Sequence, residues 1–351
     1  MTGKMRRTAE LGADFWNDSC ALGELGQAVE NGAVGATSNP VIVCEAVAGD
    51  PRTWLPVLDG LLQEHPSDTE DELAWRLIEA IGRRAAALLE PVYERTGGRK
   101  GFLSMQVNPK LYRSAERMAE HARRLAAVAP NVAVKLPATE AGLKPMEGLV
   151  AEGINVNATV SFSVSQAVAV AETYERGLRK AEASGLEMAR LHPYVTVMVG
   201  RVDDHLKRVV ERDRLAVDPG ALDWGGIAVF KRARAVFEER GCRGTLLAAA
   251  YRHVGHWREL IGPGVVLSMP YRWWRQFEAS ELVPERTLER PVDDGVLKEL
   301  SRIEDFRRAY EPDAMRPEEF VRYGASVHTL NQFLGGAQRL VELVRGRLLA
   351  S

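Results

Sequence analysis

The stretch Ala133-Val134-Lys135-Leu136-Pro137-Ala138-Thr139 is a short apolar run with one lysine in its middle. An apolar run of this length that ends at a proline is typical of a buried strand. A lysine inside such a strand is either paired, extended toward solvent from the strand end, or placed there for its amine. Burial disfavours the ammonium form and lowers a lysine pKa. Lys135 is therefore a candidate nucleophile of the kind that forms a Schiff base.

Seven further apolar segments of similar length accompany this one along the chain. The eight segments span residues 12–18, 33–40, 101–107, 132–138, 154–162, 194–200, 245–251 and 264–270. Stretches with helical composition and charges at i, i+4 spacing lie between most of them, including 70–93, 110–127, 163–183, 203–212 and 225–240. Alternating strands and helices predict a parallel sheet, and eight units predict its closure into a (β/α)8 TIM barrel of the α/β class.

The domain organisation that we expect is a single domain over residues 1–351. The barrel should occupy about 12–275 with some extra helices, and a helical C-terminal extension should occupy about 276–351. The extension ends in an amphipathic segment at 323–349, which we expect to pack across the outside or one end of the barrel. This tail is also a candidate contact in a homodimer.

Composition and charge describe an ordinary globular enzyme-sized chain. Hydrophobic residues make up 46% of 351 positions, charged residues 27%, and the net charge is −2. This balance gives no reason to expect nucleic acid or a membrane as a partner, and the first residues lack a signal-peptide core, so we expect a cytoplasmic location. The three cysteines are widely spaced, without metal-ligand spacing, so no disulfide or zinc site is indicated.

Polar side chains alternate with apolar ones near the ends of several predicted strands. In the fifth strand Asn157, Thr159 and Ser161 share one face with period two, whereas an ordinary buried barrel strand is apolar on both faces. The third strand carries Gln106 in the same manner. Active sites of such barrels lie at the carboxyl ends of the strands, so we expect these groups and Lys135 to line one site.

Six separated motifs resemble the transaldolase family, in the family's order. They are W-N-D at 16–18, A-T-S-N-P at 36–40, V-K-L-P-A-T at 134–139, G-I-N-V-N-A-T at 153–159, V-G-R-V-D at 199–203 and A-A-Y-R at 249–252. The resemblance covers about residues 10–275. It implies a class I aldolase-type barrel without metal or cofactor, which moves a dihydroxyacetone unit from a ketose phosphate to an aldose phosphate. The implied setting is the pentose phosphate pathway or a related sugar-building route.

The resemblance also implies roles for individual residues. Lys135 matches the Schiff-base lysine, and Asp18 matches the aspartate that exchanges a proton with the C4 hydroxyl of the donor. Thr159 would position the water of dehydration. The expected substrate-binding residues are Asn39 and Asn157 for hydroxyl groups, Arg201 and Arg252 for the phosphate, and Thr37, Ser161, Thr196 and Met198 around them.

Four departures from the family pattern leave alternatives open. Gln106 stands where most transaldolases have a proton-shuttling glutamate, and fructose 6-phosphate aldolases resemble this chain in having glutamine there. Met198 matches neither group, and Thr196 and Ala250 replace usual serines. The alternatives are a fructose 6-phosphate aldolase-like enzyme, a specialised sugar-assembling transaldolase, and a sugar-phosphate-binding homologue without turnover. The sequence does not identify the donor and acceptor sugars.

Overall fold

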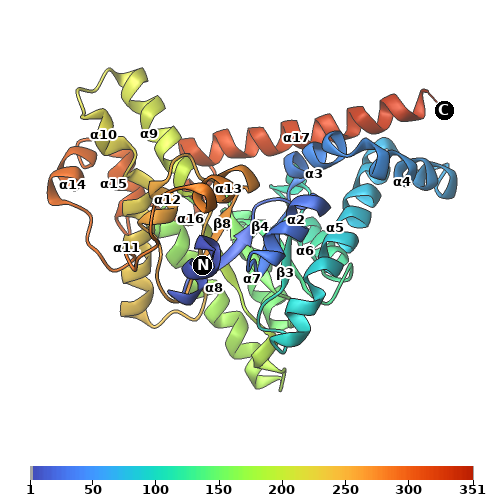
Figure 1. Ribbon diagram of the computed structural model, residues 1–351, viewed down its shortest axis with the longest axis horizontal. Helices are drawn as coiled ribbons and strands as arrows, with labels where there is room; N and C mark the ends of the chain where they lie inside the picture. Colours follow the sequence, from blue (N-terminus) through green and yellow to red (C-terminus); the bar gives the residue numbers. More distant parts are fainter. Residues whose placement is uncertain (1–2, 351) are drawn as a thin grey trace.

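The computed structural model describes residues 3–350, and the eight predicted strands form one closed barrel (Figure 1). Neighbouring strands pair in parallel, and β1 pairs with β8 as well as with β2. The strands are shorter than the apolar segments because the segment ends form the connecting loops. They are β1 (Asp14–Asn17), β2 (Gly35–Thr37), β3 (Phe102–Gln106), β4 (Val132–Pro137), β5 (Val156–Thr159), β6 (Tyr194–Val197), β7 (Thr245–Ala248) and β8 (Val265–Met269).

Helices connect the strands and surround the barrel, as the fold class predicts. Each of the five predicted helical stretches contains a helix, and α9 begins before its predicted start. The elements up to the end of the barrel are α1 (Lys4–Glu10), α2 (Leu22–Glu30), α3 (Pro40–Gly49), α4 (Pro51–Glu64), α5 (Glu70–Arg95), η1 (Pro109–Leu111), α6 (Ala115–Ala126), α7 (Glu140–Ala151), α8 (Val164–Ala183), η2 (Met188–Arg190), α9 (Val199–Asp213), α10 (Pro219–Leu222), α11 (Gly225–Arg240), α12 (Gly255–Arg258) and α13 (Tyr271–Ala279).

The helical C-terminal extension is also confirmed. It contains α14 (Asp294–Leu300), α15 (Glu304–Tyr310), α16 (Pro317–Phe320) and α17 (Gly324–Leu348). Helix α17 contacts α3, α5, η1 and α9, which follow strands β2, β3 and β6. It therefore crosses the carboxyl end of the barrel, as the red helix along one edge of Figure 1 shows.

The barrel interior is filled toward the amino ends of the strands by an apolar layer, which we call the apolar floor. Its members are Trp16, Phe102, Ala133, Tyr194, Leu247 and Val266, and the same apolar cluster continues to Ala249 just after β7. Gly35 is required beside it, because a Cβ atom there would lie 2.3 Å from Cε2 of Trp16. The floor fills this part of the barrel, and the polar residues lie one layer above it, toward the carboxyl ends of the strands.

Within residues 3–350, no helix is both long and apolar enough to cross a membrane.

Candidate active site

Lys135 lies inside the barrel, one layer above the apolar floor. It is two residues beyond Ala133 on β4, and it pairs in register with Gln106 on β3 and Asn157 on β5. Only 3% of the residue is exposed. Burial lowers the pKa of its ammonium, the charge of Asp18 opposes this change, and the charge of Arg201 reinforces it. Among the described residues no carboxylate forms an ion pair with Lys135, so the amine is left for another partner.

Asp18 follows β1 at the same end of the barrel. Its backbone N–H donates to the carbonyl of Met269 at 2.9 Å, and its carboxylate accepts a hydrogen bond from the hydroxyl of Thr37. The other β1 carboxylate, Asp14, lies at the opposite end of the strand, where Lys100 Nζ binds it at 2.5 Å. Of these two aspartates, Asp18 is the one at the carboxyl end of the strand, beside the site.

Three polar side chains inside the barrel form hydrogen bonds with one another. Asn157 Nδ2 donates to Ser104 Oγ at 3.0 Å, and Thr196 Oγ1 donates to Asn157 Oδ1 at 2.7 Å. All three residues are fully buried. Asn157 keeps one amide hydrogen for a ligand, and its orientation is fixed by both neighbours.

Two residues of the motifs also have a structural role, because their side chains cap helices. Asn39 caps α3, since its Oδ1 accepts from the N–H groups of Val41 at 2.9 Å and Ile42 at 3.1 Å. Only its NH2 group remains for a ligand. Thr139, the last residue of the motif around Lys135, caps α7 by accepting from Gly142 N–H at 3.2 Å. The two motifs thus owe part of their pattern to the start of a helix.

Several buried polar atoms at this end of the barrel have no hydrogen-bond partner among the described residues. They are Gln106 Oε1, Ser161 Oγ, Ser268 Oγ, the hydroxyl of Tyr251 and Nε of Arg201. Thr159 makes only a weak contact, with its hydroxyl 3.9 Å from Sδ of Met198. An unpaired buried polar atom costs about 1–3 kcal/mol, so a group of them indicates a place where water or a ligand completes the bonding.

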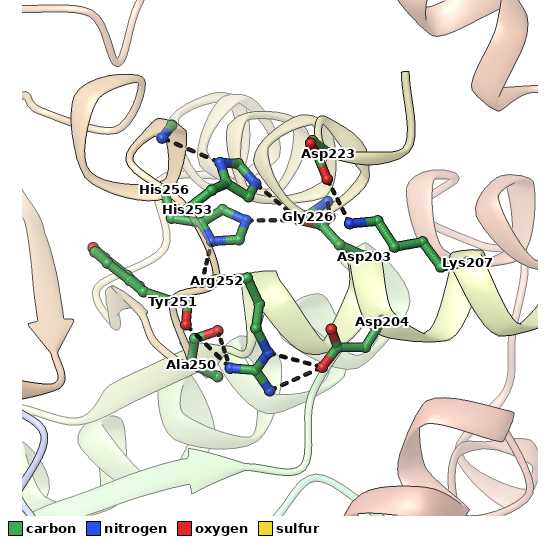
Figure 2. Close-up of polar contacts among 11 residues, drawn as sticks. Asp203, Asp204, Lys207, Asp223, Gly226, Ala250, Tyr251, Arg252, His253 and His256 are labelled. Carbon is green, nitrogen blue, oxygen red and sulfur yellow. Dashed lines mark hydrogen bonds and ion pairs between the residues drawn. The ribbon is translucent and has the colours of Figure 1, made fainter. Parts of the chain in front are cut away.

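The two predicted arginines lie beside each other but are held differently. Arg252 binds Asp204 Oδ2 through Nε at 2.9 Å and the carbonyls of Ala250 and Tyr251 through Nη1 at 3.1 Å (Figure 2). Arg201 has no carboxylate partner among residues 3–350. Burial, followed by the charge of Arg252, lowers the pKa of Arg201 to about 10, so it remains charged at neutral pH.

The helix α17 supplies contacts to the site that the sequence did not predict. Arg201 Nη1 donates to Thr329 Oγ1 at 3.1 Å and to Oε1 of Gln332, and its guanidinium carbon lies 5.4 Å from the Phe333 ring centre. Phe333 and Leu330 also line a small cavity with Gln106 and Thr159. Nothing in the amphipathic pattern of this helix shows which element it covers, so these contacts needed the structure.

A cleft of about 620 Å³ opens at Asp18, between the loop after β1, helix α3 and the start of α13. Ser19, Glu45, Tyr271 and Arg272 are among its lining residues. Its size is in the range of small-molecule sites, which are commonly about 300–1,000 Å³.

The sequence also did not predict Tyr251 and Ser268 as residues of this end of the barrel, although Tyr251 lies directly before Arg252 within a motif.

Comparisons with known proteins agree with this geometry. A family model described as transaldolase/fructose-6-phosphate aldolase matches residues 15–315. "Transaldolase 1" of Streptomyces coelicolor is 31% identical over 299 residues, covering 76% of this chain and 77% of its own. "Transaldolase" of Neisseria gonorrhoeae is 30% identical over 341 residues and 91% of each chain, and that of Neisseria meningitidis serogroup A is 36% identical over 58% of this chain and 59% of its own.

Proposed function

Since the chain belongs to the transaldolase/fructose-6-phosphate aldolase family, we propose that it transfers a dihydroxyacetone unit between sugar phosphates through an imine on Lys135. The observation that carries the proposal is the buried amine of Lys135, one layer above the apolar floor and without a carboxylate in contact among the described residues. A lysine in that setting has a lowered pKa, which raises the fraction of free amine.

In the proposed reaction the Lys135 amine attacks the ketone carbon of a ketose phosphate, and loss of water gives an iminium ion. Asp18 then accepts the proton of the C4 hydroxyl, the C3–C4 bond breaks, and its electron pair moves into the iminium to give an enamine. The aldose phosphate leaves. An acceptor aldehyde then takes its place, the enamine attacks it, and Asp18 returns the proton before water releases the product.

The phosphate group of the sugar would lie at Arg201 and Arg252. Arg201 is a mostly buried cation without a carboxylate partner among residues 3–350, and it lies in the first turn of helix α9, which begins without a side-chain cap or an acidic residue in that turn. Helix N-termini and guanidinium groups both favour a bound phosphate. This region supports a phosphorylated substrate, and the cytoplasmic location and the pentose phosphate setting are proposed with it.

The amide network supports binding of the three-carbon unit. Asn157 is held by Ser104 and Thr196 with one amide hydrogen unused, and Asn39 has a free NH2 group. Gln106 and Thr159 would hold the water that leaves and returns during imine formation, because Gln106 Oε1 is an unused buried acceptor. Ser161 and Met198 belong to the same end of the barrel and complete the proposed wall.

A second candidate is an aldolase that releases free dihydroxyacetone, and Gln106 is the observation that favours it. An amide can orient water but cannot exchange a proton near neutral pH. The two candidates differ in a simple assay. A transaldolase forms product from fructose 6-phosphate only when an acceptor aldehyde is present, whereas an aldolase releases dihydroxyacetone from the donor alone.

Borohydride trapping tests the proposal directly. The protein is incubated with fructose 6-phosphate, reduced, digested and examined by mass spectrometry. We expect a three-carbon adduct on Lys135 and none in Lys135→Arg, because the guanidinium stays protonated. The matched control Lys144→Arg, which changes an exposed lysine of α7, should keep the adduct on Lys135. An adduct on another lysine, or none with several ketose phosphates, would reject the imine at Lys135.

A further inference from the structure

A buried cluster of one carboxylate and two imidazoles lies next to the segments that carry the two arginines, and the proposed reaction does not use it. Asp203 of α9 accepts hydrogen bonds at Oδ2 from Nε2 of His256 at 2.8 Å and from Nε2 of His253 at 3.2 Å (Figure 2). Its Oδ1 accepts from the N–H of Gly226 at 2.7 Å. Asp203 and His256 are wholly inaccessible.

The backbone fixes the tautomer of both rings. Nδ1 of His256 accepts from the N–H of Arg252 at 3.0 Å, and Nδ1 of His253 accepts from the N–H of Gly255 at 3.1 Å. A backbone N–H can only donate, so each Nδ1 carries a lone pair and each ring proton is on Nε2. Both imidazoles are neutral, and both donate to a single carboxylate.

This hydrogen bonding does not fit a metal site, although the three residues lie close enough to form one. A metal ion would need the lone pairs of both Nε2 atoms. Each ring would then have to carry its proton on Nδ1, which would face the backbone N–H groups of Arg252 and Gly255. The cluster is therefore better suited to hold the backbone than to hold an ion.

The segments that the cluster connects are those that carry the arginines. Arg252 follows β7, and its own N–H is bound by His256, while its side chain reaches Asp204 on α9. Arg201 lies two positions before Asp203 on the same helix. The cluster thus fixes the loop after β7 against the first turns of α9.

The close approach of these two segments is visible in the backbone as well. Ala250 has a φ of 65°, and a Cβ atom on Gly200 would lie 2.1 Å from the carbonyl oxygen of Ala250. A left-handed conformation is unfavourable for alanine by about 1–2 kcal/mol, so other contacts must hold the loop in place. The bonds from His256 and Arg252 to this loop supply such contacts.

We propose that Asp203, His253 and His256 form a positioning clamp that sets Arg252 beside Arg201 for one phosphate monoester of the substrate. The clamp rests on the proposed function for the identity of the ligand, but its geometry is independent of the imine chemistry. It acts through Arg252 and touches no reacting atom. Its loss should therefore weaken the binding of phosphorylated sugars and leave the chemical step at saturation almost unchanged.

Two substitutions of His256 each remove one half of its bonding. In His256→Gln the amide can donate to Asp203 from a position near Nε2, but no acceptor remains for the N–H of Arg252. In His256→Asn the amide oxygen can accept that N–H from a position near Nδ1, but the side chain is too short to reach Asp203. If both bonds are needed, both variants lose the alignment of Arg252.

The readouts are the dissociation constant of inorganic phosphate, measured by calorimetry, and KM and kcat for fructose 6-phosphate and unphosphorylated fructose. Both variants should raise the phosphate dissociation constant and the KM for fructose 6-phosphate about tenfold or more. The reason is that a misaligned Arg252 loses its hydrogen bond to the phosphate, and a hydrogen bond between charged groups contributes at least that much. The fructose kinetics and kcat should change little. The control His192→Gln alters a histidine beside Asn155 and Ala189, before β6, and should leave both phosphate measures unchanged.

An unchanged phosphate affinity in both variants would overturn the clamp, and so would equal losses with fructose and fructose 6-phosphate. Absence of phosphate binding by the wild type would also overturn it. The two proposals fail separately: phosphate binding without an adduct on Lys135 rejects the reaction and keeps the clamp. If the variants do not fold, ¹⁵N NMR of the wild-type histidines decides, because an Nδ1–H tautomer at His253 or His256 contradicts the clamp.

Discussion

At the scale of single residues, the proposed site contains groups to which we assign the chemistry and groups that hold their neighbours in place. Lys135 has no ion-pair partner among residues 3–350, whereas the side chains of Asn157 and Thr196 are hydrogen-bonded to each other inside the barrel. Asp18 lies between these two cases, because Thr37 orients its carboxylate while the cleft leaves it accessible. This difference gives matched variants for the proposed roles.

The first such pair is Asp18 and Asp14, two aspartates on opposite ends of β1. Asp18→Asn should lower kcat by about 10²–10⁴-fold, because an amide cannot take the C4 hydroxyl proton. The amide oxygen can still accept from Thr37, so the fold should survive. The control Asp14→Asn loses the ion pair with Lys100 at the far end of the barrel and should keep kcat. Steady-state kinetics measures both, and equal kcat values in the two variants would refute the role of Asp18.

Gln106→Glu tests how closely position 106 is coupled to the amine. Gln106 and Lys135 are register partners with side chains on one face, so a carboxylate there should raise the pKa of Lys135 by about 1–3 units. The acidic limb of the pH profile of kcat/KM should move to higher pH by a similar amount. Gln63→Glu on the exposed part of α4 makes the same charge change as a control. If the wild type is inert and Gln106→Glu is active, the alternative of a binding homologue without turnover is favoured.

At the scale of elements, loops that follow the strands create the site, and they differ most from the sequence expectation. Residues 154–162 were expected to be one strand, but β5 ends at Thr159 because Val160 has a φ of 54°. Gln166 holds this bend, with Nε2 donating to the carbonyls of Val160 and Ala138 at 2.9 Å. The alternation of polar and apolar residues continues through Ser161, so no local pattern marks the strand end.

Gly200→Ala tests the contact between α9 and the loop after β7. The added Cβ atom would lie 2.1 Å from the carbonyl oxygen of Ala250 and 2.7 Å from Cγ of Arg252, so the loop must move. We expect a loss of about 1–3 kcal/mol in the free energy of unfolding, as for overpacked sites, together with a higher KM for fructose 6-phosphate.

The control for Gly200 is Gly26 in α2, where an added Cβ atom meets nothing within 4 Å. Gly26→Ala should stabilise the protein by about 0.5–1 kcal/mol, because alanine loses less backbone entropy in a helix. Urea unfolding and steady-state kinetics measure both variants. A stable Gly200→Ala protein with unchanged KM would show that the loop does not depend on this contact.

At the scale of the whole molecule, the barrel could be predicted from the sequence, whereas the contacts of α17 across its carboxyl end could not. Strand and helix alternation is local, so eight units were visible in the sequence, and each predicted strand segment contains a strand. The contact between Arg201 and Gln332 joins residues 131 positions apart, and no periodicity encodes it. The motifs predicted Lys135, Asp18 and the arginines as site residues, whereas the proposed clamp next to the arginines depends on which side chains the fold brings together.

The pH dependence of stability also belongs to the whole molecule, because partly and fully buried histidines in different parts of it act together. Burial lowers the pKa values of His121, His192 and His256, that of His121 to about 4. Each therefore binds a proton more readily in the unfolded chain, where the ordinary value is about 6.5. Since the unfolded state then holds more protons, stability is complete above about pH 6.5 and falls as the pH decreases toward 4.

The two carboxylates that bind histidines act below this window. The pKa values of Asp203 and Asp305 are lowered in the folded state, so their contributions are lost only below the ordinary aspartate value of about 4. Urea unfolding between pH 7 and 4.5 should therefore show a steady loss of stability, of which His121 supplies up to about 2–3 kcal/mol by pH 4.5. His121→Asn should flatten this slope, because the amide can accept the N–H of Asn108 without titrating. An unchanged slope would show that the protons are taken up elsewhere.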